Sequence, residues 1–182
     1  MRLTQERNDH LPAGADFELA VGHREIVDRS MPDLLVAAAA MKHTVSNNIV
    51  LAAGGRTMAI AAGQQSRILA TRLACAKAAR YRRMQTESVV DGVGVDRGKL
   101  TDRVARAATR SETVAEHHDD ASPVVMSSDG FIPFADNIEE AARFGVELIC
   151  EPAGAARSDA VEAAAQRCGM TLVRTRERYF YH

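Results

Sequence analysis

The stretch VVMSSDGFIPFADNIEEAARFGVELIC, residues 124–150, decides the fold class. It opens with an apolar run, passes through a polar loop into an amphipathic segment, and ends in a second apolar run. With the sequence that follows, this pattern predicts strands over 124–127, 146–150 and 170–174, and helices over 137–144 and 158–168. Strands that alternate with helices indicate an α/β fold in which helices cover a sheet on its faces.

The N-terminal half adds further elements to this frame. Pro32 opens a helix expected over 33–43, and two strands, 48–52 and 57–61, flank a Gly54-Gly55 turn. Ser66 is placed to cap a helix that runs to about Met84. Two segments are less regular. Residues 1–30 lack periodicity and predict an extended arm ahead of a 31–182 domain, whereas 86–121 read as a loop, a helix over 100–108 and a polar hinge.

Composition narrows the class of protein. The chain has 182 residues, 46% of them hydrophobic, which is enough for one compact domain, and a net charge of −1 argues against nucleic acid as a partner. Three widely spaced cysteines, Cys75, Cys150 and Cys168, argue against a disulfide framework. Because no apolar run is long enough to cross a bilayer and the N-terminus is polar, we expect a cytoplasmic protein that does not bind membranes.

Three patterns suggest other chemistry, but each has a plainer interpretation. The HHDD run, residues 117–120, could hold a metal, yet it lies in a polar hinge, and we expect no metal site. The glycines between 92 and 98 have the wrong spacing for a dinucleotide-binding loop. Lys42-His43 could be an acid–base pair, but its place near a helix C-terminus favours capping, since cations there interact favourably with the helix dipole.

Stronger signals come from three stretches that lie next to predicted strands. In HTVSNNIVLA, Asn47 stands at a helix-to-strand junction, where a carboxamide can both donate and accept hydrogen bonds. In AAGQQSRI, Arg67 lies at a helix start, where free backbone N–H groups bind anions. The loop SSDGFIPFADN combines carboxylates, aromatics, a proline and an amide directly after a strand. The chain ends in RTRERYFYH, which is either a charged tail or a site for a phosphate and a ring.

Together these stretches resemble one family, the AICAR transformylases. The resemblance rests on SNNIVLA with GRTMAIAAGQQSRILATRLACAKA, on SSDGFIPFADNIEEAARFGV, on the whole segment from Glu151 to His182, and on LTQERND near the start. It covers nearly all of the chain and is weakest over 86–121. It implies a cytidine-deaminase-like αβα sandwich with a mixed sheet, of which the family domain holds two units and this chain matches only the second, the C-terminal half.

The resemblance also implies roles for individual residues. Asn47 and Arg67 would be catalytic, the first contacting the amine and carboxamide of a nucleotide substrate and the second a carboxamide or formyl oxygen. The remaining residues would bind the two ligands: Phe131, Arg178 and Phe180 the nucleotide, and Ile68, Pro133, Asp136 and Asn137 the folate. The sequence departs from the family at Ala61, Gly130, Ile132 and Tyr181. It also lacks the Lys-His-Val-Ser-Pro type motif of the first unit, which carries the base.

The expected function follows from this resemblance. Family members transfer a formyl group from 10-formyltetrahydrofolate to the 5-amino group of AICAR, without a metal, at sites on a dimer interface. We therefore expect a formyltransferase subunit that acts on AICAR or a related amino-azole nucleotide. It would work as a homo-oligomer, or as a hetero-oligomer with a chain that resembles the first half and supplies the Lys-His pair. The alternative is a non-catalytic, regulatory protein that binds a nucleotide or folate.

Overall fold

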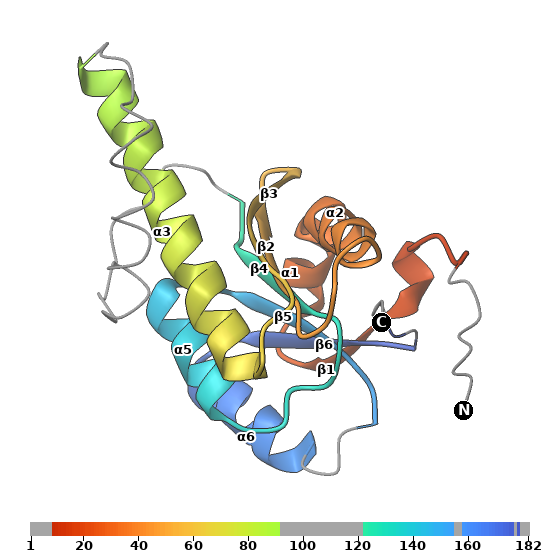
Figure 1. The fold of residues 1–182 in the computed structure, drawn as a ribbon. Helices are drawn as coiled ribbons and strands as arrows, with labels where there is room; N and C mark the ends of the chain where they lie inside the picture. The colour runs from red at the N-terminus through yellow and green to blue at the C-terminus, as the bar shows by residue number, and fades with distance from the viewer. Residues whose placement is uncertain (1–8, 92–121, 155–157, 177, 179–182) are drawn as a thin grey trace, which may run out of the picture.

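The computed structural model describes residues 9–91, 122–154, 158–176 and 178, and only the backbone of residues 85–91. The described residues form an α/β fold with helices packed around one mixed sheet (Figure 1). In chain order the elements are η1 (Gly14–Asp16), β1 (Phe17–Val21), α1 (Arg24–Arg29), α2 (Met31–Met41), β2 (Ile49–Ala53), β3 (Arg56–Ala61), α3 (Arg67–Asp91), β4 (Val125–Ser128), α5 (Asp136–Phe144), β5 (Leu148–Pro152), α6 (Ser158–Arg167) and β6 (Thr171–Thr175).

The six strands of the described sheet lie in the order β1-β6-β5-β4-β2-β3. Strands β4, β5 and β6 are parallel, as the alternation of strands and helices predicts. Strand β2 runs antiparallel to both β3 and β4, and β1 runs antiparallel to β6. The starts of β1 and β2 therefore lie at the same edge of the sheet as the C-terminal ends of β3, β4, β5 and β6.

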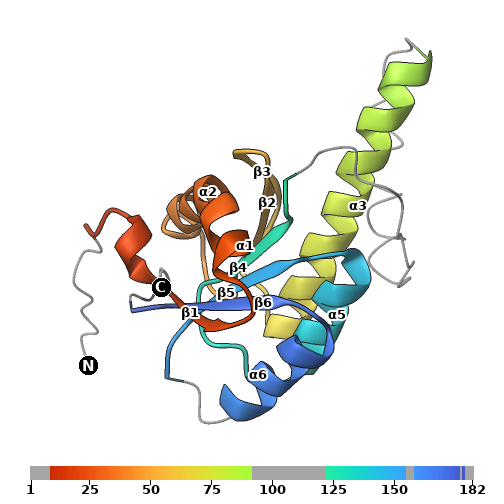
Figure 2. The same ribbon diagram turned by 180° about the vertical axis from the view of Figure 1, so that it is seen from behind.

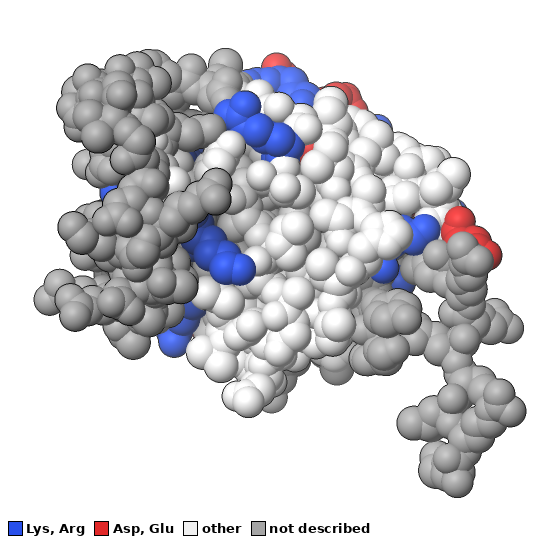
Figure 3. Space-filling model, turned by 45° about the horizontal axis from the view of Figure 1, so that its top comes forward, with Lys and Arg blue, Asp and Glu red and all other residues white. Residues whose placement is uncertain are grey.

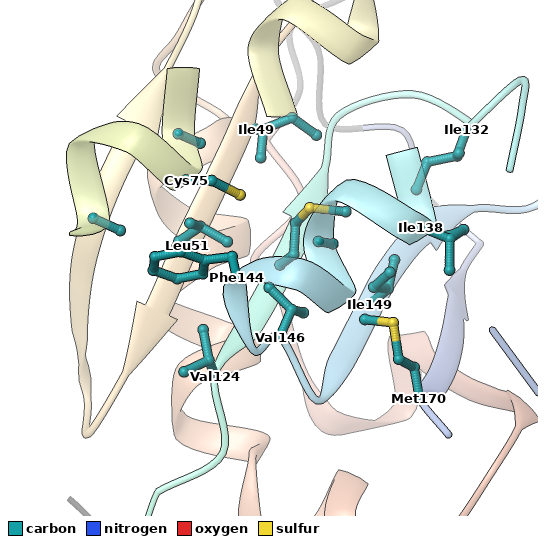
Figure 4. Close-up of a cluster of buried hydrophobic side chains, with 14 of the residues drawn as sticks. Ile49, Leu51, Cys75, Val124, Ile132, Ile138, Phe144, Val146, Ile149 and Met170 are labelled. Carbon is teal, nitrogen blue, oxygen red and sulfur yellow. The ribbon is translucent and has the colours of Figure 1, made fainter. Parts of the chain in front are cut away.

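Helices cover both faces of the sheet and make three layers (Figures 1 and 2). Alternate side chains of β2 point to opposite faces of the sheet, and both faces are buried. Ile49 and Leu51 join the larger apolar cluster, which lies under α3, α5 and α6 (Figure 4). Val50 and Ala52 join the second cluster, which lies under α1 and α2. Strand β2 therefore contributes side chains to both apolar clusters.

Most predicted elements are confirmed with small shifts at their ends. The helix expected over 33–43 is α2, the hairpin is β2 and β3, and the alternating elements after residue 124 are β4 to β6. Ser66 caps α3, since its Oγ accepts a hydrogen bond from the N–H of Leu69 at 3.4 Å. Helix α3 continues past the predicted end at Met84 to Asp91. The helix expected over 100–108 and most of the polar hinge after it lie outside the described residues.

The arm expected over residues 1–30 needs correction, because residues 17–29 are built into the fold. Strand β1 extends the sheet, with Phe17 opposite Thr175, and the Phe17 side chain is buried. Helix α1 follows, and Val27 on it is buried in the second cluster. The register of β1 is irregular between Leu19 and Val21. This irregularity breaks the period-2 alternation by which a strand is usually identified.

Charge is unevenly spread over the face shown in Figure 3, where Lys and Arg side chains gather on the side of α3 and much of the remaining described surface is uncharged. Helix α3 carries a run of cations with no acidic residue before Glu87: Arg67, Arg72, Lys77, Arg80, Arg82 and Arg83. Basic charge is therefore concentrated on one helix of a chain whose net charge is only −1. None of the helices in the described part of the chain is long and apolar enough to span a membrane.

The three cysteines are free, as the sequence predicts. Burial raises the pKa of both Cys75 and Cys150 to about 12, so these thiols stay protonated near neutral pH and act as apolar core groups. Cys168 is exposed.

Candidate functional site

The sheet brings the separate motif stretches to one edge. Ile49 at the start of β2 lies opposite Ser128 at the end of β4 and opposite Ala61 at the end of β3. The C-terminal ends of β5 and β6 lie at the same edge because these strands are parallel to β4. Each stretch that the sequence analysis selects lies next to one of these strand ends. Ligand sites in open α/β sheets are commonly found beyond the carboxyl ends of parallel strands.

A buried carboxylate joins two of these stretches. Asp129 directly follows β4 and is 0% exposed, and its Oδ1 accepts hydrogen bonds from the backbone N–H of Asn48 at 3.0 Å and from Nη1 of Arg67. The N–H of Asp129 in turn donates to the Asn48 carbonyl at 3.3 Å. Since a buried charged group is costly unless it is paired and hydrogen-bonded, Arg67 is the ion-pair partner that this buried carboxylate requires.

Arg67 is the first residue of α3, and its side chain turns toward the end of β4. The side chain is 10% exposed, and Nη1 also donates to Ser128 Oγ at 2.9 Å. Ser128 Oγ donates its own proton to the carbonyl of Gly130 at 2.6 Å. The sequence predicts that Arg67 lies at a helix start, where an anion could bind. In the structure, its guanidinium group is held by the loop that follows β4.

Asn47 contacts the segment that connects β3 to α3, just before Arg67. Its side-chain Nδ2 donates to the carbonyl of Gln64 at 2.9 Å, and the backbones of the two residues exchange hydrogen bonds at 3.3 and 3.2 Å. The peptide bond between Ser46 and Asn47 is cis. The segment before β2 is therefore fixed on one side by Gln64 and on the other, through Asn48, by Asp129. The two residues expected to be catalytic, Asn47 and Arg67, are thus brought to one place.

The loop after β4 exposes aromatic rings and buries an anchor. Phe131 is 41% exposed and Phe134 is 52% exposed, whereas Ile132 between them is fully buried. The backbone N–H of Ile132 donates to Glu151 Oε2 at 2.6 Å. Because one residue of the loop is held in the core, its neighbours Phe131 and Pro133 are presented at the surface. This is the arrangement expected if Phe131 stacks on a ligand ring.

Glu151 lies at the end of β5 and is fully buried. Burial raises the pKa of its carboxyl group, and the hydrogen bond from Ile132 together with the charges of Arg174 and Arg67 partly opposes that rise. Arg174 Nε lies 3.9 Å from Glu151 Oε1, and Arg174 Nη2 lies 2.6 Å from Glu162 Oε1 on α6. A buried acid therefore underlies the exposed loop at the same sheet edge.

The N-terminal turns of α3 and α5 are joined by one buried hydrogen bond. Thr71 Oγ1 donates to Asn137 Oδ1 at 2.9 Å, and Nδ2 of Asn137 donates to Asp136 Oδ1 at 2.8 Å. Asn137 is buried, while Asp136 is exposed and Ile68, one turn before Thr71, is half-buried. Of the four residues expected to line a folate pocket, Asn137 is thus placed to hold Asp136 rather than to meet solvent.

The C-terminal residues are only partly described. Arg178 is exposed, and its Nη2 would lie 3.7 Å from a Cβ added at Gly154, in the segment after β5. Arg178 therefore lies near the end of β5, on the edge that carries the other candidate residues. Phe180 and Tyr181 lie outside the described residues.

The other candidate groups have plainer structural roles or lie outside the described residues. Lys42 is the C-cap of α2, as capping predicts, and its ammonium donates to the carbonyl of His10. His43 beside it is exposed. Within the described ranges, no group of three or more His, Cys, Asp and Glu side chains is arranged to hold a metal ion. The HHDD run at 117–120 lies outside them.

The residues that hold the separate parts of the site together are not evident from the sequence alone. Asp129 and Asn48 are adjacent to selected residues, but their pairing depends on the antiparallel register of β2 and β4, which no local pattern encodes. Glu151 gave a weak signal, since an acidic residue directly after the apolar run LIC is unusual for a buried strand. The fold and this edge together define an α/β protein with a polar site beyond its strand ends, rimmed by exposed aromatic side chains.

Comparison with known proteins finds one matching family model and several similar proteins. A family model described as the AICARFT/IMPCHase bienzyme matches residues 1–77. The chain is 32% identical over 180 residues to the bifunctional purine biosynthesis protein PurH of Rhodospirillum rubrum, and equally to those of Paracoccus denitrificans and Roseobacter denitrificans. Each alignment covers 99% of this chain but 28% of the relative. The chain therefore spans little more than a quarter of the length of these curated relatives.

Proposed function

We propose that this chain is a subunit of a folate-dependent formyltransferase with a cytidine-deaminase-like fold, acting in the cytoplasm in purine biosynthesis. It would transfer the formyl group of 10-formyltetrahydrofolate to the 5-amino group of AICAR or a related amino-azole nucleotide. One observation carries the proposal: Asn47, Arg67 and the Phe131 loop, distant in sequence, meet at one sheet edge through Asp129. The similarity to PurH proteins along almost the whole chain supports it.

The residues at this edge suit the chemistry of formyl transfer. The substrate amine attacks the formyl carbon, loses a proton to a base, and displaces tetrahydrofolate through a tetrahedral intermediate. An oxyanion develops on the formyl oxygen, and a guanidinium such as that of Arg67 can stabilise it. The Asn47 carboxamide can orient the amine and the neighbouring carboxamide. Phe131 would pack on the imidazole ring.

The folate would bind beside these residues, where the first turns of α3 and α5 are tied together by Thr71 and Asn137. Ile68 and Pro133 offer apolar surface, and the exposed carboxylate of Asp136 can accept hydrogen bonds from the N–H groups of a pterin-like ring. Arg178 would hold the nucleotide phosphate, for which a guanidinium is well suited. Face-to-face positioning of two large ligands supplies much of the catalytic effect.

The base would come from a partner. Lys42 donates to the His10 carbonyl, so its ammonium group is already engaged within this chain. A second chain that resembles the first half of the transformylase would supply the Lys-His pair. The exposed side chains of Val45, Leu69, Phe131 and Phe134 lie on the segments that form this edge and offer apolar surface for the contact.

Formyl transfer by the purified chain, alone and mixed with a candidate partner chain, tests the proposal. We expect very slow transfer alone and a gain of about 10²–10⁴-fold with the partner, the usual contribution of a general base. Arg67→Ala should abolish the gain, whereas Arg24→Ala, an exposed arginine on α1, should not. Full activity of the isolated chain would overturn the split site and implicate His43 or His182. Ligand binding without activity in any mixture would favour the regulatory alternative.

A further inference from the structure

The Asp129 carboxylate accepts a backbone hydrogen bond in addition to its ion pair, so it links two parts of the chain. Oδ1 takes both the Asn48 N–H and the Arg67 guanidinium, while Oδ2 is buried and has no hydrogen-bond partner among the described residues. Among the described residues, only one of the two Asp129 carboxylate oxygens is therefore hydrogen-bonded, although the side chain is fully buried. The desolvation cost of a buried carboxylate is offset here by one cation and one backbone donor.

The Arg67 guanidinium occupies space that exists because residue 130 is glycine. A Cβ at Gly130 would lie 2.6 Å from Nη2 of Arg67 and 3.4 Å from its Cζ, so any other residue would displace the group. On the other side, Ser128 Oγ accepts from Nη1 at 2.9 Å and is itself oriented by its bond to the Gly130 carbonyl. Three consecutive residues therefore enclose the guanidinium: Ser128, Asp129 and Gly130.

The same carboxylate controls the Asn47 side of the site. Asn48 donates its N–H to the Asp129 carboxylate and accepts from the Asp129 N–H. It is covalently next to Asn47, whose side chain is fixed by Gln64. A shift of Asp129 would therefore move the start of β2 and the start of α3 together. Catalytic groups must be held within about 0.5 Å of their productive positions.

We propose that Asp129 is the positioning residue of this site. It fixes the Arg67 guanidinium relative to Asn47, in a space that Gly130 leaves open. The role assigned to Arg67 toward a ligand rests on the proposed function, whereas the control of its position does not. Asp129 is not a catalytic residue, because it acts through Arg67 and Asn48.

A ligand-free experiment tests the positioning directly. The full chain is treated with p-hydroxyphenylglyoxal, which modifies accessible arginines, and the rates at Arg67 and Arg72 are followed by peptide mass spectrometry. Arg72 is an internal reference, since its side chain is 56% exposed. We expect Arg67 to react about 10-fold more slowly than Arg72, because a hydrogen bond to a charged group shifts an equilibrium by that order.

Two variants should release Arg67. Asp129→Asn keeps the shape and an oxygen for the Asn48 N–H but removes the negative charge. Gly130→Ala changes no charge and only fills the space beside Nη2. Both should raise the rate at Arg67 about 10-fold while leaving that at Arg72 unchanged. Glu139→Gln removes an exposed carboxylate from α5 and should change neither rate. Unchanged Arg67 reactivity in either folded variant would overturn the proposal.

Calorimetric titration with AICAR separates this inference from the proposed function. If the wild-type assembly binds AICAR, Asp129→Asn and Arg67→Ala should each weaken binding about 10-fold, and the double variant should be no worse than Arg67→Ala alone. Additive losses would show that Asp129 does not act through Arg67. If the wild type binds neither AICAR nor a related amino-azole nucleotide, the proposed function fails, and the modification rates alone decide the role of Asp129.

Discussion

Thr71 on α3 and Asn137 on α5 meet in a buried hydrogen bond of 2.9 Å, from the threonine hydroxyl to the amide oxygen. Asn137 also donates to Asp136, so one amide links two helices and the first exposed acid of α5. The resemblance assigns Asn137 to a folate pocket. Its burial shows that it also supports the structure, and the two roles can be separated.

Asn137→Ala should lower the free energy of unfolding by about 1–3 kcal/mol, since it leaves the buried Thr71 hydroxyl without this partner. Thr71→Val should also destabilise the protein, because it leaves the buried amide oxygen of Asn137 without this donor. The double variant should lose less than the sum, as residues in direct contact do. Urea unfolding measures all three. Strict additivity would mean that the hydrogen bond contributes no coupling between the helices.

Glu151 should make stability depend on pH. Burial raises its pKa above the ordinary 4.5, against the Ile132 N–H and the charges of Arg174 and Arg67. The folded state then binds a proton more tightly than the unfolded state. The stability that this group contributes is fully present below pH 4.5 and is lost as the pH rises through its folded pKa.

Glu151→Gln should remove that dependence while keeping an oxygen for the Ile132 N–H. Unfolding in urea at a series of pH values above 4.5 should show the variant gaining on the wild type as the pH rises. Glu139→Gln, at an exposed position, is the control and should follow the wild type. Parallel curves for Glu151→Gln and wild type would contradict the assignment.

Arg178 and Asp136 should discriminate between the two ligands. Arg178→Ala should weaken nucleotide binding about 10- to 100-fold, the loss expected for a hydrogen bond to a charged group, and leave folate binding nearly unchanged. Asp136→Ala should do the reverse. Calorimetric titration of each ligand into the assembly that binds it gives both constants. Wild-type nucleotide affinity in Arg178→Ala would mean that the C-terminal residues form only a charged tail.

Gly22 should be one of the least replaceable residues of the N-terminal segment. It has φ +92°, and an added Cβ would lie 2.6 Å from Thr171 Oγ1 and 2.8 Å from Thr171 Cα. Gly55 is a matched control, because it has φ +74° but no atom within 4 Å of an added Cβ. Gly55→Ala should cost about 1–3 kcal/mol of strain, and Gly22→Ala should cost more because it adds a clash with β6. Equal losses of stability in thermal unfolding would show that the segment at Gly22 moves away from Thr171 at no cost.

The elements that the sequence predicts well are those with strong local patterns. Strands β4 and β5 each begin in a short apolar run, and α5 and α6 have one apolar face between turn residues. Strand β1 escaped prediction because its burial does not alternate and its partner, β6, is the last strand of the described sheet. Local periodicity does not encode a pairing between segments so distant in sequence.

The candidate site divides in the same way. Asn47, Arg67 and the Phe131 loop carry residue types that are unusual at strand ends, so the sequence selects them. Their convergence depends on Asp129, whose importance comes from the register that sets Ile49 opposite Ser128. No property of Asp129 as a residue distinguishes it from Asp136, which follows seven residues later at the start of α5 but is exposed.

The pairing of β1 with β6 also has a consequence during synthesis on the ribosome. The N–H of His23, just after β1, bonds to Thr171 Oγ1 in β6, 148 residues later. At about 5–20 residues per second, the nascent β1 waits on the order of 7–30 s before its partner strand is made. Throughout that interval Phe17 and Val21, both buried in the finished sheet, have no strand to pair with, so the N-terminal segment of the nascent chain is a natural client for a chaperone.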